Sequence, residues 1–409
     1  MADWDASFLR LKRALPSSLL TLHAMIEQGG YQACMVGGSV RDLLLGKKPK
    51  DYDLASSATP HQLKTLLEGI EGIKIIELGR AFGTLGVGFE GWLFEITTFR
   101  QEGEYRDHRH PSALKFVKSI ESDLARRDFT INALALHPQK GLLDLYNGLE
   151  DLKKGVLRLV GDPTLRLQED ALRILRALRF ASVLGFSLEE VTQKALWAQA
   201  HLLEHIAKER ICMEFFKLLL GDFVRSCVPF QSLLEKTLKA RLKPLEGLEN
   251  TPLNLRARLL YLAQSWDTQT LRDFCTRLKF SKKLTQSLYK LHAHFPLEPQ
   301  EPPRLWIKTQ LQSLYLGELR ALLGFYQTQD PVLSARLKSE LKDILHKREA
   351  YALRHLAIKG TDLLELGFQG TQVGALLKAC LEGVMCGAVC NEREALLQYA
   401  KECPALREN

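Results

Sequence analysis

The hydrophobic pattern of the chain changes near residue 160, and this change limits the possible folds more than any other feature. Before it, short runs of apolar and β-branched residues alternate with turn residues, as strands do. After it, apolar residues recur every three or four positions, which is typical of amphipathic helices. We therefore predict an α+β fold, with mixed helix and strand first and helices after it. The predicted strands cover residues 33–36, 74–78, 84–89, 93–99, 114–117 and 132–136.

The sequence also predicts two helices and one long loop. Leucines at helical spacing predict one helix over residues 6–28 and another over residues 166–184. A polar tract over residues 100–112 shows no apolar periodicity, and we expect a loop there, since long loops inside compact domains are often functional. Proline-containing segments divide the later helices at residues 246–254, 294–305 and 329–333.

Composition narrows the class of partner without identifying one. The 409 residues are enough for more than one core, and 56 Lys and Arg against 48 Asp and Glu make the chain basic. A basic surface suits nucleic acid or a nucleotide, although a solvated charge surplus gives the same totals. The eight cysteines form no CxxC pair, no apolar run reaches the length of a membrane span, and the first residues do not resemble a signal peptide. We expect a cytoplasmic protein with free thiols.

Two aspartates one residue apart, Asp51 and Asp53, stand in the segment DYD. On a strand their side chains share one face, because strand side chains alternate with a period of two. Two carboxylates on one face repel each other unless a cation lies between them, and hard oxygen ligands favour Mg²⁺. That arrangement suits phosphoryl or nucleotidyl transfer, but an Asp-rich surface turn has the same residues.

The segment GGSVRD places Gly37 and Gly38 between a predicted strand and the start of a helix. A glycine turn at a helix N-terminus offers free N–H groups to a phosphate, and Arg41 can reach the same phosphate. A plain strand-to-helix turn is the alternative. The aspartate pair ten residues after Arg41 favours nucleotide binding over that alternative.

Two further segments add carboxylates and arginines. GVGFEG at residues 86–91 fits a dinucleotide fingerprint, but a strand follows it where a helix is required, so we interpret it as a hairpin turn. The strand that follows carries Glu95, which we expect near the aspartate pair. In RRDFTINAL, Arg127 suits a triphosphate, and Asp128 or Asn132 suits ribose hydroxyls, unless the segment is only the charged start of a helix.

Charged residues recur every three positions in EDALRILRALRF, as Asp170, Arg173, Arg176 and Arg179. On a helix such neighbours lie on adjoining faces. Asp170 only accepts hydrogen bonds and Arg173 only donates them, so the pair offers an acceptor beside a donor, which matches the edges of cytosine and adenine. Taken alone, the segment is better explained by an exposed ion pair on a helix surface.

In this order, the segments resemble one family. The sequence is similar to the bacterial class II tRNA nucleotidyltransferases, the CCA-adding group of the DNA polymerase β-like nucleotidyltransferases, with bacterial poly(A) polymerase as a near relative. The strong motifs cover about residues 35–186, and IKGTDLLELG follows late in the chain. They are VGGSVRDLLLG, KDYDLASSATP, EITTFRQEGEYRDHRHP, DLARRDFTINALAL and DLYNGLEDLKKGVLRLVGDPTLRLQEDALRILRALRFASVLGF.

The resemblance implies a role for each matched position. Asp51 and Asp53 match the catalytic carboxylates that bind metal, with Glu95 as a supporting acid and Mg²⁺ as the cofactor. Nucleotide contacts are matched by Gly37, Gly38, Arg41, Arg127, Asp128, Asn132, Asp170, Arg173, Arg176 and Arg179.

Three groups of these residues have more specific matches. Residues 127–132 fall in the motif that discriminates ribose, and Asp170 with Arg173 match the amino-acid template that reads C and then A. The loop over residues 102–110 matches the flexible element that switches the pocket from CTP to ATP.

The resemblance also implies an architecture and a reaction. A polymerase β-like head with a small mixed sheet would precede an all-helical neck, body and tail, and the tail would bind the acceptor arm of tRNA. The enzyme would add CCA to the 3′ end of tRNA from CTP and ATP, without a template, and release pyrophosphate. It implies no membrane, and no protein partner is inferable. The implied domains are the head over 1–155, the neck over 156–220, the body over 221–350 and the tail over 351–409.

Other functions share parts of this pattern. An enzyme that adds only A, and a poly(A) polymerase, carry nearly the same motifs. The intact segment QEGEYRDHRHP favours a chain able to add A, and the sequence shows no long basic extension typical of poly(A) polymerases. The aspartate pair argues against an inactive RNA-binding protein. The long helical part argues against a nucleotidyltransferase for a small acceptor.

Overall fold

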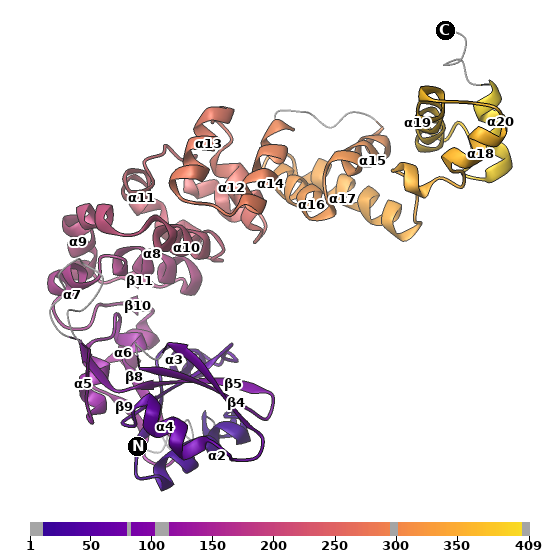
Figure 1. The fold of residues 1–409 in the computed structure, drawn as a ribbon. Coiled ribbons are helices and arrows are strands. Elements are labelled where there is room, and N and C mark those ends of the chain that lie inside the picture. The colour runs from indigo at the N-terminus through magenta and orange to yellow at the C-terminus, as the bar shows by residue number, and fades with distance from the viewer. Residues whose placement is uncertain (1–10, 80–82, 103–113, 295–301, 403–409) are drawn as a thin grey trace. The chain divides into compact units, whose positions relative to one another are not determined.

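The chain forms two compact units, Met1–Ala240 and Arg241–Asn409, and the first holds every predicted site residue. The computed structural model describes residues 11–79, 83–102, 114–294 and 302–402 (Figure 1). Of the loop expected to switch between CTP and ATP, residues 103–110 lie outside the described residues. The unit boundary at Ala240 lies inside the predicted body, and the finer division into four domains stays a prediction.

A seven-stranded mixed sheet is the framework of the first unit, in the order β3-β4-β5-β2-β1-β8-β9. β2 and β5 run parallel, and the other neighbouring pairs of this sheet run antiparallel. Five of the six predicted strand segments fall in this sheet, and the sixth falls in β7 (Leu114–Phe116), which pairs with β6 (Arg100–Glu102). The strands of the sheet are β1 (Ala33–Val36), β2 (Tyr52–Ser56), β3 (Ile73–Gly79), β4 (Thr84–Phe89), β5 (Trp92–Thr98), β8 (Leu134–His137) and β9 (Gly141–Asp144).

The two faces of this sheet carry different chemistry. Its helices are α2 (Ser17–Gln28), α3 (Gly38–Leu44), α4 (Pro60–Leu67) and α5 (Ile120–Ala125). One face packs against α2 and α4 in the main apolar core, to which Leu54 and Phe94 belong. Because side chains alternate along each strand, Asp53 and Glu95 lie on the opposite face. Asp53 and Glu95 therefore lie on a sheet whose other face is buried.

Helices make up most of the remaining described residues, as predicted, and the short strands β10 and β11 form a parallel pair among them. The first unit continues with η2 (Thr130–Asn132), α6 (Gly148–Lys154), β10 (Val156–Leu157), α7 (Pro163–Glu169), α8 (Arg173–Leu184), β11 (Ser187–Leu188), α9 (Glu190–Gln199), η3 (Ala200–His205), α10 (Lys208–Leu219), η4 (Val224–Phe230) and α11 (Gln231–Leu238). The second unit contains η5 (Leu245–Asn250), α12 (Leu255–Leu262), α13 (Thr268–Arg277), α14 (Lys282–Ala293), α15 (Pro303–Ser313), α16 (Leu316–Tyr326), α17 (Pro331–His346), η6 (Leu353–His355), α18 (Gly360–Glu365), α19 (Thr371–Cys386) and α20 (Arg393–Glu402). Within the described ranges, no helix has both the length and the apolar content needed to cross a membrane.

Two predicted helices are wrong in extent. The helix predicted over residues 6–28 is interrupted before Ser17, where Pro16 stands at the N-cap of α2 and cannot donate a helical hydrogen bond. The helix predicted over residues 166–184 is two helices, because α7 ends at Glu169 and α8 begins at Arg173. At the break, Asp170 has extended backbone angles and its Oδ1 accepts the N–H of Leu172 at 3.1 Å, which competes with helical hydrogen bonding.

Candidate active site

Three carboxylates gather at one place on the sheet. Asp53 on β2 and Glu95 on β5 are register partners in the parallel pair. Glu95 therefore lies beside Asp53, as expected. Asp51 lies in the bend just before β2, so strand alternation does not place it as the sequence pattern predicted. It is still close enough for its charge to act on Asp53. The acids therefore share one region, although only two of them lie on strands.

Crowding of negative charge perturbs the central carboxylate. Burial, together with the negative charges of Glu95 and Asp51, raises the pKa of Asp53 to about 6, against the opposing positive charge of Arg127. A divalent cation bound there would relieve this repulsion, and carboxylate oxygens are the ligands that Mg²⁺ prefers. The donor set of Asp51 and Asp53 therefore fits a divalent cation.

The glycine turn brings an arginine against the backbone beside these acids. Gly37 has φ of +72°, a left-handed conformation that glycine adopts without strain. A Cβ atom at this position would lie 2.7 Å from Nη1 of Arg127. Arg127 Nη2 donates to Oδ2 of Asp123 at 3.0 Å, while its buried Nε has no hydrogen-bond partner among the described residues. Arg127 thus keeps a donor for a ligand.

Replacing Gly37 with alanine is expected to lower nucleotide addition by roughly tenfold or more, because the new methyl group must displace Arg127. Gly46→Ala is the matched control, since Gly46 has φ of +71° and no described atom lies within 4 Å of the added Cβ. Thermal unfolding should show a loss of stability in both variants from backbone strain, and a larger loss in Gly37→Ala because of the contact with Arg127. Equal activity of the two variants would mean that the position of Arg127 does not matter.

A chain of hydrogen bonds connects the glycine-turn helix to α8. Arg41 Nη1 donates to Oδ1 of Asn132 at 2.7 Å, Asn132 Nδ2 donates to Oδ1 of Asp128 at 3.0 Å, and Arg176 Nε donates to Oδ2 of Asp128 at 2.8 Å. Burial alone would raise the pKa of Asp128. The guanidinium of Arg176 and the hydrogen bonds from Asn132 and Phe129 N–H instead hold this pKa well below its usual range. Asp128 therefore stays ionised and fixes both neighbours.

An aromatic ring that sequence reasoning missed organises the arginines. Guanidinium carbons of Arg41, Arg176 and Arg179 lie 5.2, 5.6 and 4.2 Å from the ring centroid of Phe180. Phe129 supports this ring edge-on, with centroids 5.4 Å apart. Each of these arginines also pairs with a carboxylate: Arg41 with Asp42, Arg176 with Asp128 and Arg179 with Glu214. The ring therefore gathers three oriented guanidinium groups, which are donors that suit the phosphates of a nucleotide.

Sequence reasoning also missed two buried acids that form ion pairs with arginines of the site region. Asp123 pairs with Arg126 at 2.8 Å and with Arg127 at 3.0 Å. Glu214 of α10 pairs with Arg179 at 2.9 Å. The three- and four-residue spacing of Asp123 from its arginines was a usable signal in the sequence. Glu214 gave none, because it lies far along the chain from its partner.

The pair expected to read the base is not an acceptor beside a donor on one helix. Asp170 lies in the break between α7 and α8, where its Oδ2 accepts from Arg210 Nη2 at 3.2 Å. Arg173 is buried, and its guanidinium donates to the carbonyl of Arg166 at 2.6 Å and to Glu169 at 2.8 Å. The prediction of one continuous helix was wrong, so the side-by-side placement of Asp170 and Arg173 on adjoining faces of one helix, which depended on it, is wrong as well.

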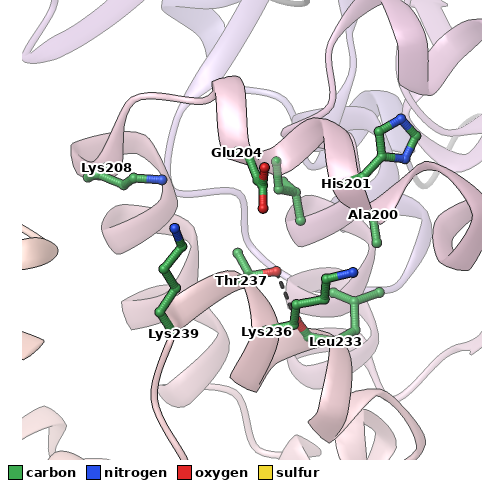
Figure 2. A pocket seen from close by; sticks show the side chains of 9 residues that line it. Ala200, His201, Glu204, Lys208, Leu233, Lys236, Thr237 and Lys239 are labelled. Atoms are coloured by element: carbon green, nitrogen blue, oxygen red, sulfur yellow. Dashed lines mark hydrogen bonds between the residues drawn. The ribbon is translucent and has the colours of Figure 1, made fainter.

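A shallow pocket in the same unit gathers lysines and contains none of the predicted site residues (Figure 2). Lys208 begins α10, and Lys239 follows the end of α11; Figure 2 shows their side chains converging. Lys236 and Glu204 also line the pocket. Two ammonium groups facing each other favour an anion such as a phosphate between them.

Three family models match successive parts of the chain. The model described as "Poly A polymerase head domain" matches residues 33–158 and so covers the carboxylates and the glycine turn. A model of the RNA- and SrmB-binding site proposed for polymerase A matches residues 185–241, which include the lysine pocket. A model of a proposed second domain of tRNA nucleotidyltransferase matches residues 255–400.

Curated relatives and solved structures match almost the whole chain. The CCA-adding enzyme of Leuconostoc mesenteroides is 36% identical, over 92% of this chain and 94% of its own length. That of Ligilactobacillus salivarius is 35% identical, over 96% of each chain. The crystal structure of the Bacillus stearothermophilus CCA-adding enzyme in complex with CTP superposes with a TM-score of 0.78, at 30% identity over 96% of this chain and 98% of that one.

Proposed function

Because the chain belongs to the tRNA nucleotidyltransferase and poly(A) polymerase family, we propose that it adds C, C and A to the 3′ end of tRNA. It takes the nucleotides from CTP and ATP, needs no nucleic-acid template and releases pyrophosphate. The observation that carries this function is identity of 35 to 36% with CCA-adding enzymes over more than nine-tenths of both chains. With tRNA and nucleoside triphosphates as substrates, we expect it to act in the cytoplasm.

The reaction needs positioning and charge more than proton transfer. The terminal 3′-hydroxyl of tRNA attacks the α-phosphorus of the nucleotide, a new P–O bond forms, and the bond to pyrophosphate breaks. We assign the phosphates to Arg41, Arg127 and Arg176, which the hydrogen bonds described above hold in place before substrate arrives. Arg179 and the Gly37–Gly38 turn complete this phosphate-binding set.

Ribose and base selection are assigned to the residues around Asp128 and Asp170. Asn132 and Asp128 lie between the arginines and are assigned to the ribose hydroxyls. Asp170 and Arg173 are assigned to the base, as the family resemblance implies. Since Asp170 now holds Arg210 and Arg173 holds Glu169, base binding would require a change of partner at one of these two residues.

The family uses divalent metal ions, and we propose Mg²⁺ held by Asp51 and Asp53, with Glu95 beside them. Bound there, Mg²⁺ would supply a lowered pKa for the attacking hydroxyl and stabilisation of negative charge on the pyrophosphate. The support for this assignment is the crowding of the three carboxylates, which raises the pKa of Asp53.

The variant Asp53→Asn, which removes one of the crowded charges, tests metal binding separately from folding. Mg²⁺ at about ten times its Kd should raise the melting temperature of the unaltered protein by roughly 2–4 °C, because it binds only the folded state. In Asp53→Asn this increase should disappear. The metal-free variant should melt no lower than the metal-free unaltered protein, since the substitution relieves carboxylate repulsion. An equal Mg²⁺ effect in both proteins would place the metal elsewhere.

The helical parts are proposed to hold the tRNA. We propose that head, neck, body and tail end at residues 155, 220, 350 and 409, and that the tail binds the acceptor arm. Lys208 and Lys239 in the neck and body are suited to RNA phosphates, because their ammonium groups converge in one pocket (Figure 2).

Three labelled RNAs test the function: tRNA ending at the discriminator base, tRNA ending in CC, and an unstructured RNA. Each is incubated with the protein, Mg²⁺ and CTP, ATP or both, and the products are sized to single nucleotides. Three nucleotides on the first RNA and one on the second are expected. Extension of only the CC-ended tRNA, by one A, would make the protein A-adding. Long A tracts on all three would make it a poly(A) polymerase.

A further inference from the structure

A groove in the second unit combines exposed aromatic and apolar side chains with cations. It lies between α14, the segment joining α15 to α16, η6 and α19. Its volume of about 870 Å³ is within the range of pockets that bind small organic groups. None of the site residues assigned above lines it.

One tyrosine stands at this groove in an arrangement that folding does not require. The side chain of Tyr315 is 75% exposed, and Lys290 Nζ lies 4.9 Å from the centroid of its ring. The backbone of Tyr315 serves the fold at the start of α16: its N–H donates to Oε2 of Glu318 at 3.0 Å, and its carbonyl accepts the N–H groups of Glu318 and Leu319 at 2.8 and 2.9 Å. The ring is therefore free to stack without loss of the helix cap. Leu353 on the groove wall is also exposed, at 41%.

The charge of the groove indicates the class of ligand. Lys290, Arg354 and Lys378 line it, against the single carboxylate of Glu382, which leaves two positive charges in excess. An apolar protein segment needs no such excess, and an acidic peptide needs no exposed ring. An RNA base with its flanking phosphates needs both, since bases stack on aromatic rings and phosphates bind cations.

We propose that this groove binds an unpaired nucleotide of the tRNA, with its base stacked on Tyr315 and its phosphates near Lys290 and Lys378. The proposal rests on the proposed function, because it takes tRNA as the substrate. It assigns the second unit a specific contact with tRNA. The nucleotide must be unpaired, because the double-helical arms of tRNA offer no base face to stack.

Equilibrium binding of fluorescent tRNA tests the groove without relying on catalysis. Tyr315→Ala should raise the Kd for tRNA roughly 5- to 100-fold, which is the usual range for the loss of one base stack. Tyr315→Phe keeps the ring and should bind as the unaltered protein does. Val332→Ala is the control, because Val332 is 81% exposed at the other end of α17, roughly 20 Å from the groove residue Leu345.

A second variant tests the phosphate contact of the groove. The outcomes below also distinguish a failure of the groove proposal from a failure of the proposed function. Lys378→Ala on α19 should lower the slope of log Kd against log salt by about one unit. An unchanged Kd in Tyr315→Ala would overturn the proposed role of the groove. A Kd for Tyr315→Phe as high as that of Tyr315→Ala would overturn it as well, because the contact would then depend on the hydroxyl group and not on the ring. If the unaltered protein binds tRNA but extends none, the proposed function fails while the groove result still stands.

Discussion

Asp53→Ala is expected to reduce nucleotide addition by roughly 1000-fold or more, because it removes a carboxylate that holds the catalytic cation. Asp53 is also the acid whose pKa the neighbouring Glu95 and Asp51 raise, so it lies at the centre of the three carboxylates. Single-turnover extension of CC-ended tRNA with ATP measures this effect directly. Affinity for tRNA should not change, since most of the RNA contacts are assigned to other parts of the chain.

The control for this variant is another carboxylate of the same sheet. Glu77 is exposed on β3 and pairs with Lys64 of α4 at 3.7 Å, which places it on the helix-covered side. Glu77→Ala should therefore keep full activity. Substantial extension by Asp53→Ala, beyond a few per cent of the unaltered rate, would show that these carboxylates do not form the metal site.

Asp128→Ala is expected to lower both stability and activity. The substitution leaves Arg176 without its partner and breaks the chain of hydrogen bonds that positions Asn132 and Arg41. The free energy of unfolding should fall by about 2–4 kcal/mol, as for other buried charge pairs that lose one member. Measured where the variant is still folded, kcat/KM for CTP should fall roughly 100-fold, since two phosphate-binding arginines lose their orientation.

Asp151→Ala separates the two effects. Asp151 is as buried as Asp128 and holds Thr130 at 2.7 Å and Arg158 at 3.1 Å, but it does not contact the arginines around Phe180. Chemical denaturation should show a loss of stability in both variants. Nucleotide addition at a temperature where both are folded should fall only in Asp128→Ala. Equal losses of activity would mean that Asp128 acts through stability alone.

Local pattern was enough to predict most of the main sheet. Runs of apolar residues predict five strands of the main sheet, because a buried strand must be apolar wherever it packs. The glycine turn was also predictable, since Gly37 adopts a positive φ that other residues avoid. Glu95 was expected near Asp53 from its strand position, and the parallel register of β2 and β5 places the two side by side.

Contacts between distant segments were not predictable from local pattern. Apolar spacing runs through Asp170 without interruption, yet its carboxylate bonds to Leu172 N–H and to Arg210, forty residues away, and the helix breaks. Phe180 has the spacing of an ordinary core residue, and its role with three arginines appears only once Arg41 of α3 is brought to α8. Periodicity reports which face of an element is buried, but it does not report the partner.

The mass of the 3′ end after extension shows which nucleotides the protein adds to tRNA. A tRNA that stops at the discriminator base is incubated with the protein, Mg²⁺ and all four nucleoside triphosphates, and its released 3′ fragment is weighed. We expect a gain equal to the mass of two C and one A, and no further growth. Incorporation of G or U would contradict the proposed function, because Asp170 and Arg173 would then not select the base. Growth beyond the single A would contradict it as well.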